Sequence, residues 1–317
     1  MQTLHELAMC PNCSSTKLSW NSTTVSCVDC LSEFRRDEEF VDFVESRLLN
    51  DLEVKALEVW GSDLHATALS APAHFVQIQS IFPDLWQRSL RGRVLEIGCG
   101  SGTDTLHLSK LNDSISLFAF DLGFNVAGLS RMLRNQKNTH IFRATALRIP
   151  LKNDTIDMVY SFGVFHHTRN PAKCFEEAYR VLNKNGAIFF YLYSAHEDNP
   201  IKYAGIWLEK VLMQTFTSIP NFLHTPFLFV VSIPCLLLFS WPARILKMCG
   251  LDRFARKFPM YWGTTPASIL PDLKDRLLAP VNHRFKYKDL KNLLELTSFH
   301  EIQIKKTSAG LYGYCVK

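Results

Sequence analysis

The chain has 317 residues, of which 47% are hydrophobic and 21% charged, and its formal net charge is +5. This length suits one large domain or two to three smaller ones with a substantial buried core. The charge permits contact with phosphates or anionic lipids, but it is too small to predict a nucleic-acid binder, and no DNA partner is expected. The first residues carry neither the basic nor the apolar segment of a secretory signal, and we predict a cytoplasmic protein.

Two CxxC pairs stand near the start of the chain. Cys10 and Cys13 form the first pair, and Cys27 and Cys30 form the second after thirteen intervening residues. Four thiolates at this spacing suit one tetrahedral ion, usually zinc, and a site that uses all four as ligands is structural rather than catalytic. A redox pair or two disulfides are the alternatives, which a reducing compartment disfavours. The polar and β-prone residues 17–25 predict a short hairpin between the pairs.

The segment after the second pair, residues 33–44, reads EFRRDEEFVDFV. With the cysteines it gives a CxxC…CxxC…F…DF arrangement over residues 8–44. This arrangement resembles the small zinc-ribbon domain that activates methyltransferases and is fused in front of some of them. The resemblance implies a zinc-ribbon-like domain over residues 1–44, and the stretch 45–90 is predicted to be a helical linker or cofactor lid.

Residues 94–102 read VLEIGCGSG, an apolar strand that ends in a turn with Gly98, Gly100 and Gly102. A helix is predicted over residues 103–111. A strand, a glycine turn and a helix N-terminus together let the backbone approach a ligand closely and direct free N–H groups at it. Glu96 is an acid inside this strand, where packing alone would favour an apolar residue.

Strand-like and helix-like segments then alternate along the chain. This order predicts an α/β fold with a doubly wound parallel sheet and a ligand at the carboxyl ends of its strands. Asp121 ends the second strand, 19 residues beyond Gly102. Its carboxylate can accept hydrogen bonds from both hydroxyls of a ribose, although a surface aspartate that caps the next turn is the alternative. At this point NAD and S-adenosylmethionine both remain possible ligands.

Two later segments distinguish them. The runs IPLKNDTIDMVYSFGVFHHTRNP and EEAYRVLNKNGAIFFYLYS, with VLEIGCGSG before them, resemble a class I S-adenosylmethionine-dependent methyltransferase of the type 11 branch over residues 92–195. The resemblance implies a Rossmann-like core over residues 91–195 and 283–317. It also implies S-adenosylmethionine as the cofactor.

Carried onto this chain, the resemblance implies a set of cofactor-binding residues. These are Glu96, Gly98, Gly100 and Gly102 along the methionine and ribose, Asp121 at the ribose hydroxyls, Thr145, Ala146 and Leu147 along the adenine, and Ser161, Phe162 and Gly163 beside the reacting methyl group. Thr145 stands where the family usually has an acid. A hydrogen bond to the adenine amino group is therefore expected from a hydroxyl or from the backbone.

Histidine is the side chain best suited to remove a proton from a methyl acceptor near neutral pH. His166 and His167 follow the fourth strand at the substrate side, and one of them is a candidate base. The alternative is that they order the following loop. His283 with Arg284 is a second candidate pair, and hydrogen bonding at the start of the last helix explains it equally well.

Residues 196–282 do not belong to the common core and are predicted to form an apolar helical insert. Residues 222–241 carry no charge, and Pro226 and Pro234 are expected to interrupt them. A basic cluster follows that suits anionic headgroups: Arg244, Lys247, Arg253, Arg256 and Lys257. The insert is open to three interpretations: a lid over a hydrophobic substrate, a hairpin dipping into a membrane surface, or a single membrane span.

The sequence thus predicts a zinc-bearing methyltransferase that acts on a hydrophobic small molecule or a lipid-linked acceptor, at an oxygen atom. A lipid acceptor would make the protein peripheral at the inner face of a membrane. An RNA base methyltransferase and a non-catalytic cofactor-binding scaffold remain as alternatives, and an NAD dehydrogenase is a more distant one.

Overall fold

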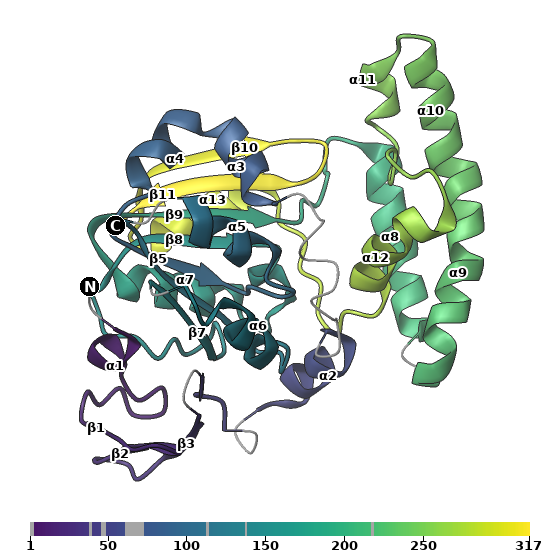
Figure 1. Cartoon of the computed structure of the whole chain (residues 1–317). Helices are drawn as coiled ribbons and strands as arrows, with labels where there is room; N and C mark the ends of the chain where they lie inside the picture. The colour runs from purple at the N-terminus through teal and green to yellow at the C-terminus, as the bar shows by residue number, and fades with distance from the viewer. Residues whose placement is uncertain are drawn as a thin grey trace.

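The computed structural model describes residues 3–37, 40–45, 49–60, 73–111, 114–136, 138–216 and 219–317. Parts of the expected linker, 46–48 and 61–72, lie outside these ranges. In the described residues one sheet of eleven strands runs through the protein, in the order β1-β2-β3-β4-β7-β6-β5-β8-β9-β11-β10 (Figure 1). The strands are β1 (Leu18–Trp20), β2 (Thr24–Cys27), β3 (Glu33–Arg36), β4 (Val41–Asp42), β5 (Arg93–Ile97), β6 (Ser116–Asp121), β7 (Thr139–Arg143), β8 (Ile156–Phe162), β9 (Leu182–Leu192), β10 (His300–Lys306) and β11 (Leu311–Val316).

The central strands β7, β6, β5, β8 and β9 are parallel, and β11 is antiparallel to both β9 and β10. Alternate side chains of each central strand enter different cores, and both cores are apolar. Leu117 packs in one buried cluster and its neighbour Phe118 packs in another. This is the doubly wound α/β sheet that the sequence predicts.

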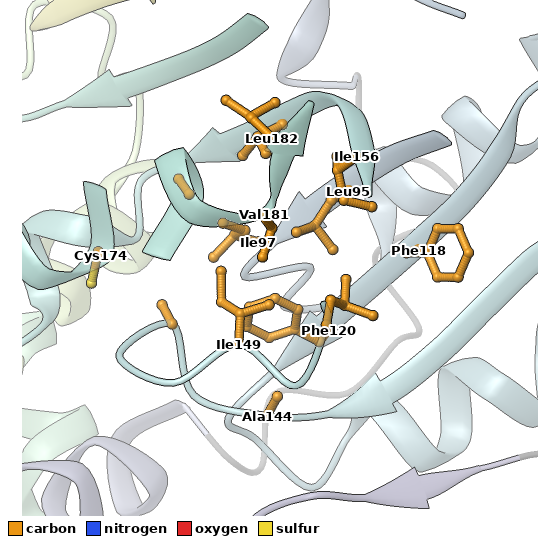
Figure 2. Close-up of a cluster of buried hydrophobic side chains, with 14 of the residues drawn as sticks. Leu95, Ile97, Phe118, Phe120, Ala144, Ile149, Ile156, Cys174, Val181 and Leu182 are labelled. Atoms are coloured by element: carbon orange, nitrogen blue, oxygen red, sulfur yellow. The ribbon is translucent and has the colours of Figure 1, made fainter. Parts of the chain in front are cut away.

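Helices cover both faces of the sheet. One face carries α3 (Phe75–Ile81), α4 (Pro83–Ser89), α5 (Thr103–Leu111) and α6 (Val126–Leu133). The opposite face carries α7 (Pro171–Val181) and α13 (Tyr287–Leu296). Figure 2 shows part of this second core, in which Val181 of α7 lies near Leu95 and Ile97 of β5. With both faces buried, the edges and ends of the sheet are left for the ribbon and for ligands.

The insert forms a helical unit beside the sheet (Figure 1). Its elements are α8 (Pro200–Phe216), η4 (Asn221–Leu223), α9 (His224–Cys235), η5 (Leu236–Ser240), α10 (Trp241–Met248), α11 (Asp252–Ala255) and α12 (Pro266–Leu277). α8 and α12 lie between the sheet and α9, and a separate apolar cluster holds these helices together. The remaining helical segments are α1 (Leu4–Leu7), α2 (Asp51–Trp60) and η3 (Phe165–His167).

The expected interruption at Pro226 and Pro234 is wrong, because one helix runs from His224 to Met248. Pro226 lies in the first turn, where the missing N–H would have no helical partner. Pro234 lies inside α9, and the helix widens into the π-helical segment η5 two residues later. That wider turn accommodates the backbone without ending the helix.

The N-terminal ribbon extends the sheet rather than standing apart from it. Its strand β4 pairs in parallel with β7, with Val41 beside Phe142 and Asp42 beside Arg143. Apolar residues of the ribbon, such as Phe34 and Phe43, belong to the same buried cluster as Phe142. The ribbon and the α/β sheet therefore share one core, and we expect them to unfold together.

Arg143 stabilises the contact between β4 of the ribbon and β7 of the sheet. Its side chain is 1% exposed, and its Nη1 lies 2.9 Å from Oδ2 of Asp42. Its Nε donates to the carbonyl oxygen of Leu122, and its guanidinium lies 3.8 Å from the ring centre of Phe124. A buried guanidinium depends on such partners because an unpaired buried charge is costly.

We predict that Asp42→Asn lowers the free energy of unfolding by about 3 kcal/mol, since it leaves the buried Arg143 without its counter-charge. Asn keeps an oxygen for the N–H of Val44, which Asp42 now accepts. Urea denaturation measures the difference. The control is Asp29→Asn, because Asp29 pairs with Lys17 at an exposed site of the same ribbon and such pairs contribute little. Equal losses in the two variants would contradict the role of Arg143.

Candidate functional site

The four cysteines of the CxxC pairs come together at one end of the ribbon. Their Sγ atoms all lie within 4.8 Å of one another. Two contacts cross between the pairs, at 3.6 Å from Sγ of Cys10 to Sγ of Cys30 and 3.5 Å from Sγ of Cys13 to Sγ of Cys27. These separations exceed a disulfide bond of about 2.05 Å. They suit a tetrahedral zinc ion, whose sulfur ligands at about 2.3 Å would lie roughly 3.8 Å apart.

Both pairs are held by the same turn. Ser14 donates its N–H to the carbonyl oxygen of Cys10, and Leu31 donates to that of Cys27. Ser14 and Leu31 both have left-handed backbones, with φ of 62° and 60°. A left-handed backbone is unfavourable for residues other than glycine, so the repeated turn indicates a constraint that a bound metal would supply. The cluster of four cysteines thus fits structural zinc.

A cavity of about 350 Å³ lies at the carboxyl ends of β5, β6, β7 and β8. Eight of the eleven residues predicted to bind the cofactor line it. They are Gly98, Gly100, Asp121, Thr145, Ala146, Leu147, Phe162 and Gly163.

The glycine turn and Asp121 form one hydrogen-bonded unit in this cavity. Gly100 and Gly123 donate their N–H groups to Oδ2 and Oδ1 of Asp121, each at 2.9 Å. Gly100 has φ of +50°, and a side chain built there would meet no atom within 4 Å. At Gly98 a Cβ would lie 2.1 Å from Val164. The turn therefore needs glycine for conformation and packing, and it leaves open space where a ligand can approach the backbone.

The other three predicted residues, Glu96, Gly102 and Ser161, do not line the cavity. Glu96 is 2% exposed and accepts a hydrogen bond from Thr105 at 2.7 Å. Burial, with Asp104 nearby, raises its pKa well above the usual value. A Cβ at Gly102 would lie 2.4 Å from Leu129 of α6, and Ser161 donates to the carbonyl oxygen of Ile97. Glu96, Gly102 and Ser161 therefore stabilise the glycine turn from the side that faces away from the cavity.

Sequence reasoning missed several residues that line the cavity. Leu52, Glu53 and Ala56 come from α2, and Asp275 comes from α12. α2 and α12 lie outside the motif-bearing segment, and no pattern in the sequence ties them to it. The sequence could have indicated Asn125, because it follows Asp121 closely. In the structure its side-chain amide donates to the carbonyl oxygen of Gly100 at 2.7 Å.

A second cavity of about 490 Å³ lies between the sheet and the insert. Phe162 lines both cavities, so the two are neighbours on either side of this residue. Much of its wall is apolar: Leu208, Leu212, Val231, Phe239, Leu273 and Leu277. Glu209, Asp272 and Arg276 add charge. Burial lowers the pKa of Lys202 to about 8 and that of His196 to about 3.

The three candidate histidines differ in what they reach. His167 lines the first cavity, whereas neither cavity includes His166 or His283. His166 is fully buried, and the centre of its ring lies 4.0 Å from the centre of the Tyr193 ring. Its ring nitrogens have no hydrogen-bond partner among the described residues. Burial lowers its pKa well below the usual value. His283 Nε2 lies 3.1 Å from the carbonyl oxygen of Thr168, and Arg284 pairs with Glu209.

His167 belongs to a polar cluster at the junction of the two cavities. Its Nδ1 lies 2.9 Å from the carbonyl oxygen of Val281, which only accepts, so Nδ1 carries a proton. Its Nε2 lies 3.3 Å from Oδ2 of Asp275, which also accepts from the Tyr193 hydroxyl. Burial acts to raise the pKa of Asp275, but His167 and these hydrogen bonds outweigh it and hold that pKa below the usual value.

Residues 95–190 match the family model of a methyltransferase domain. The chain contains a class I S-adenosylmethionine-dependent methyltransferase domain. Both the glycine turn and the loops after β6, β7 and β8 fall inside the matched residues. The cofactor of this family is S-adenosylmethionine, and the open glycine turn with its adjoining carboxylate fits the ribose and methionine of such a molecule.

Curated relatives share this methyltransferase domain. A malonyl-[acyl-carrier protein] O-methyltransferase of Marinomonas sp. is 32% identical over 99 residues, which cover 31% of this chain and 36% of the relative. A cycloartenol-C-24-methyltransferase of Arabidopsis thaliana is 25% identical over 100 residues, covering 31% of this chain and 30% of the relative. The chain thus spans about a third of these relatives' length. A solved methyltransferase from Aquifex aeolicus aligns over 78% of this chain and 94% of its own, with 14% identity and a TM-score of 0.43.

We predict that Cys13→Ser abolishes zinc binding and lowers the melting temperature of the whole chain by roughly 5–10 °C, because the metal contributes to folding. At about 2 °C per kcal/mol for a chain of this size, this decrease corresponds to a loss of about 2.5–5 kcal/mol in stability. The unfolding trace should keep a single transition, because the ribbon and the methyltransferase domain share a core. Elemental analysis and calorimetry measure the two effects. Cys249→Ser, at an exposed cysteine of the insert, is the control. A separate low-temperature transition for the ribbon would contradict the shared core.

Proposed function

We propose that the protein transfers the methyl group of S-adenosylmethionine to an oxygen atom of a hydrophobic small molecule or a lipid-linked acceptor. The observation that carries this proposal is a pair of neighbouring cavities that share Phe162 in their walls, one at the glycine turn and one lined by the insert. The first has the polar groups that a nucleoside requires. The second has the apolar wall that a hydrophobic acceptor requires.

Within the first cavity, Asp121 would accept the ribose hydroxyls, the turn from Gly98 to Gly100 would follow the methionine, and Ala146 and Leu147 would lie along the adenine. The cofactor supplies a methyl group that its positive sulfur already activates. The protein must then align the acceptor with that methyl group and exclude water. The apolar lid formed by α8, α9 and α12 suits both tasks.

The cluster of His167, Asp275 and Tyr193 would handle the acceptor's proton. Because the carbonyl oxygen of Val281 holds the proton on Nδ1, Nε2 is the ring nitrogen that would accept the proton of an acceptor hydroxyl. When bound, the cofactor would supply the methyl group for the new C–O bond, and its sulfur would retain the electron pair of the C–S bond. The hydroxyl proton passes to Nε2, and the nearby Asp275 carboxylate stabilises the imidazolium that results.

The relatives support methyl transfer as the reaction more strongly than they support any one methyl acceptor. Their names give malonyl-[acyl-carrier protein] and cycloartenol as acceptors, which differ from one another. The proton-accepting cluster suits an acceptor that loses a proton when it is methylated, and a hydroxyl is one such acceptor. The apolar wall of the second cavity supports a hydrophobic acceptor over a nucleic-acid base.

We expect His167→Gln to reduce methyl transfer by about 100-fold or more while calorimetry shows unchanged affinity for S-adenosylhomocysteine. The assay incubates the protein and labelled S-adenosylmethionine with a cell extract, then separates lipid, small-molecule, RNA and protein fractions. His283→Gln is the matched control, since that ring lines neither cavity, and it should transfer methyl groups normally.

Label in the lipid or small-molecule fraction supports the proposed acceptor, and label in RNA would replace it with an RNA base. Failure of the wild-type chain to bind the cofactor in calorimetry would favour a scaffold without catalysis. Full activity of His167→Gln would end the proposed role of the histidine as base.

We also propose that the insert contacts an anionic membrane surface. The helix His224–Met248 is long and apolar enough to cross a membrane by length and composition, with a mean hydropathy of 1.9 and 28% of its apolar window buried. Large apolar side chains remain exposed along the insert, including Trp207, Leu238, Trp241, Ile245, Met248 and Phe254. An exposed apolar surface of this extent is typical of a membrane or protein contact.

Charge favours the membrane. Arg244, Lys247, Arg253, Arg256 and Lys257 are all exposed on or beside α10 and α11. The last three line a hollow of about 400 Å³ with Lys202 and Lys306. Cations beside an exposed apolar face suit anionic headgroups above an acyl layer. Such a contact would bring a lipid acceptor to the second cavity, since Leu208 and Trp262 line that cavity and are also exposed.

We predict that the protein floats with vesicles containing phosphatidylglycerol and much less with vesicles of phosphatidylcholine alone. Replacing Arg253, Arg256 and Lys257 together by glutamine should lower the partition coefficient on the order of 100-fold, at about 1 kcal/mol per charge. Lys288→Gln, on α13 outside the insert, is the control. A protein that ignores both vesicles would leave the insert as a lid alone, and one that resists carbonate extraction would instead span the membrane.

A further inference from the structure

The adenine end of the first cavity lacks the acid that the family resemblance places at position 145. Thr145 stands there, and its hydroxyl donates a hydrogen bond to Oε1 of Glu53 at 3.0 Å. Glu53 is 9% exposed and lines the cavity with its helix neighbours Leu52 and Ala56. A carboxylate from α2 therefore lies beside the position from which the usual carboxylate is missing.

The start of α2 holds this carboxylate in place. The Asn50 side-chain oxygen accepts the N–H groups of Leu52 and Glu53, and Oε2 of Glu53 accepts both the backbone N–H and the side-chain amide of Asn50. This reciprocal arrangement is a capping box with Asn50 at the cap and glutamate three residues later. It orients Glu53 before any ligand binds and cuts the entropy lost on binding.

The capping box explains only one of the two carboxylate oxygens. Oε2 is used by Asn50, whereas Oε1 faces Thr145 at the cavity wall. A carboxylate oxygen can accept two hydrogen bonds, and among the described residues Thr145 provides one to Oε1. Oε1 can therefore accept a further hydrogen bond from a donor in the cavity, and the exocyclic amino group of adenine is such a donor.

We propose that Glu53 reads the adenine base of the cofactor by accepting a hydrogen bond from its 6-amino group at Oε1, with Thr145 orienting the carboxylate. This inference rests on the proposed cofactor-dependent function. It changes the expectation drawn from the sequence, in which a hydroxyl or the backbone would bind that amino group. Here the hydroxyl of Thr145 acts through Glu53, and a helix outside the matched methyltransferase domain provides the specificity-determining residue.

The proposal has a direct chemical consequence. Hypoxanthine has an oxygen acceptor at position 6 in place of the amino donor of adenine, and its N1 carries a hydrogen that adenine lacks. An acceptor facing the Glu53 carboxylate gains no hydrogen bond and is repelled. Hydrogen bonds to charged groups are strong enough that the protein should prefer adenine by about 10-fold or more.

The test is calorimetry on the full-length chain with S-adenosylhomocysteine and with its inosine counterpart, in which hypoxanthine replaces adenine. Wild type should bind the adenine compound about 10-fold or more tightly. Glu53→Gln should abolish or reverse the preference, because the single amide oxygen that keeps the hydrogen bonds from Asn50 leaves the NH2 group facing the base, where it can donate to the hypoxanthine oxygen but cannot accept from the adenine amino group. Glutamine also serves in a capping box, so α2 should still form, and the melting temperature checks this.

Two further variants sharpen the test. Glu53→Gln combined with Thr145→Asp returns a carboxylate to the usual position and should restore the preference for adenine. Glu58→Gln, at an exposed acid on the same helix, should leave both affinities unchanged.

The outcomes separate the two proposals. If wild type binds neither compound, the proposed function fails. If wild type binds both compounds equally well, the cofactor assignment stands and the role of Glu53 is overturned. If Glu53→Gln weakens both compounds by the same factor, Glu53 only caps α2, and the proposal is likewise overturned.

Discussion

Burial of both faces of the parallel sheet is the constraint on which the rest of the structure depends. Because α3, α4, α5 and α6 cover one face while α7 and α13 cover the other, ligands can reach the strands only at their ends. The backbone turns that follow β5, β6, β7 and β8 therefore line the first cavity, together with Glu53 of α2 and Asp275 of α12. Gly100 and Asp121 meet there because their strands are neighbours in the sheet, and their hydrogen bond fixes one turn to the next.

The two additions to this core use the places that the sheet leaves free. The ribbon adds strands at the β7 edge, where Arg143 and Asp42 close the junction. The insert follows β9 and folds beside the carboxyl ends, where it can enclose an acceptor. One addition therefore contributes to stability through the shared core, and the other is positioned to govern what enters the site.

How far the sequence could predict the site depends on how local each signal was. The cysteine pairs and the glycine run are short patterns whose geometry follows from neighbouring residues, and both come together as their spacing indicates. Glu96 and Ser161 carry equally clear signals, yet their side chains point behind the turn, because alternation along a strand sends every second residue into a core. Pattern alone does not distinguish a residue that supports a turn from one that lines it.

By itself, then, the sequence predicted the parallel sheet from periodicity and the metal-binding residues from the spacing of the cysteines, and the resemblance of its motifs to a methyltransferase family indicated the cofactor. Only the tertiary structure decided which histidine reaches a cavity and which carboxylate lies beside Thr145. His167 meets Asp275 through the packing of α12, and Thr145 meets Glu53 from 92 positions away. Such contacts depend on how distant helices pack, and packing is set by the whole core rather than by any local run of residues.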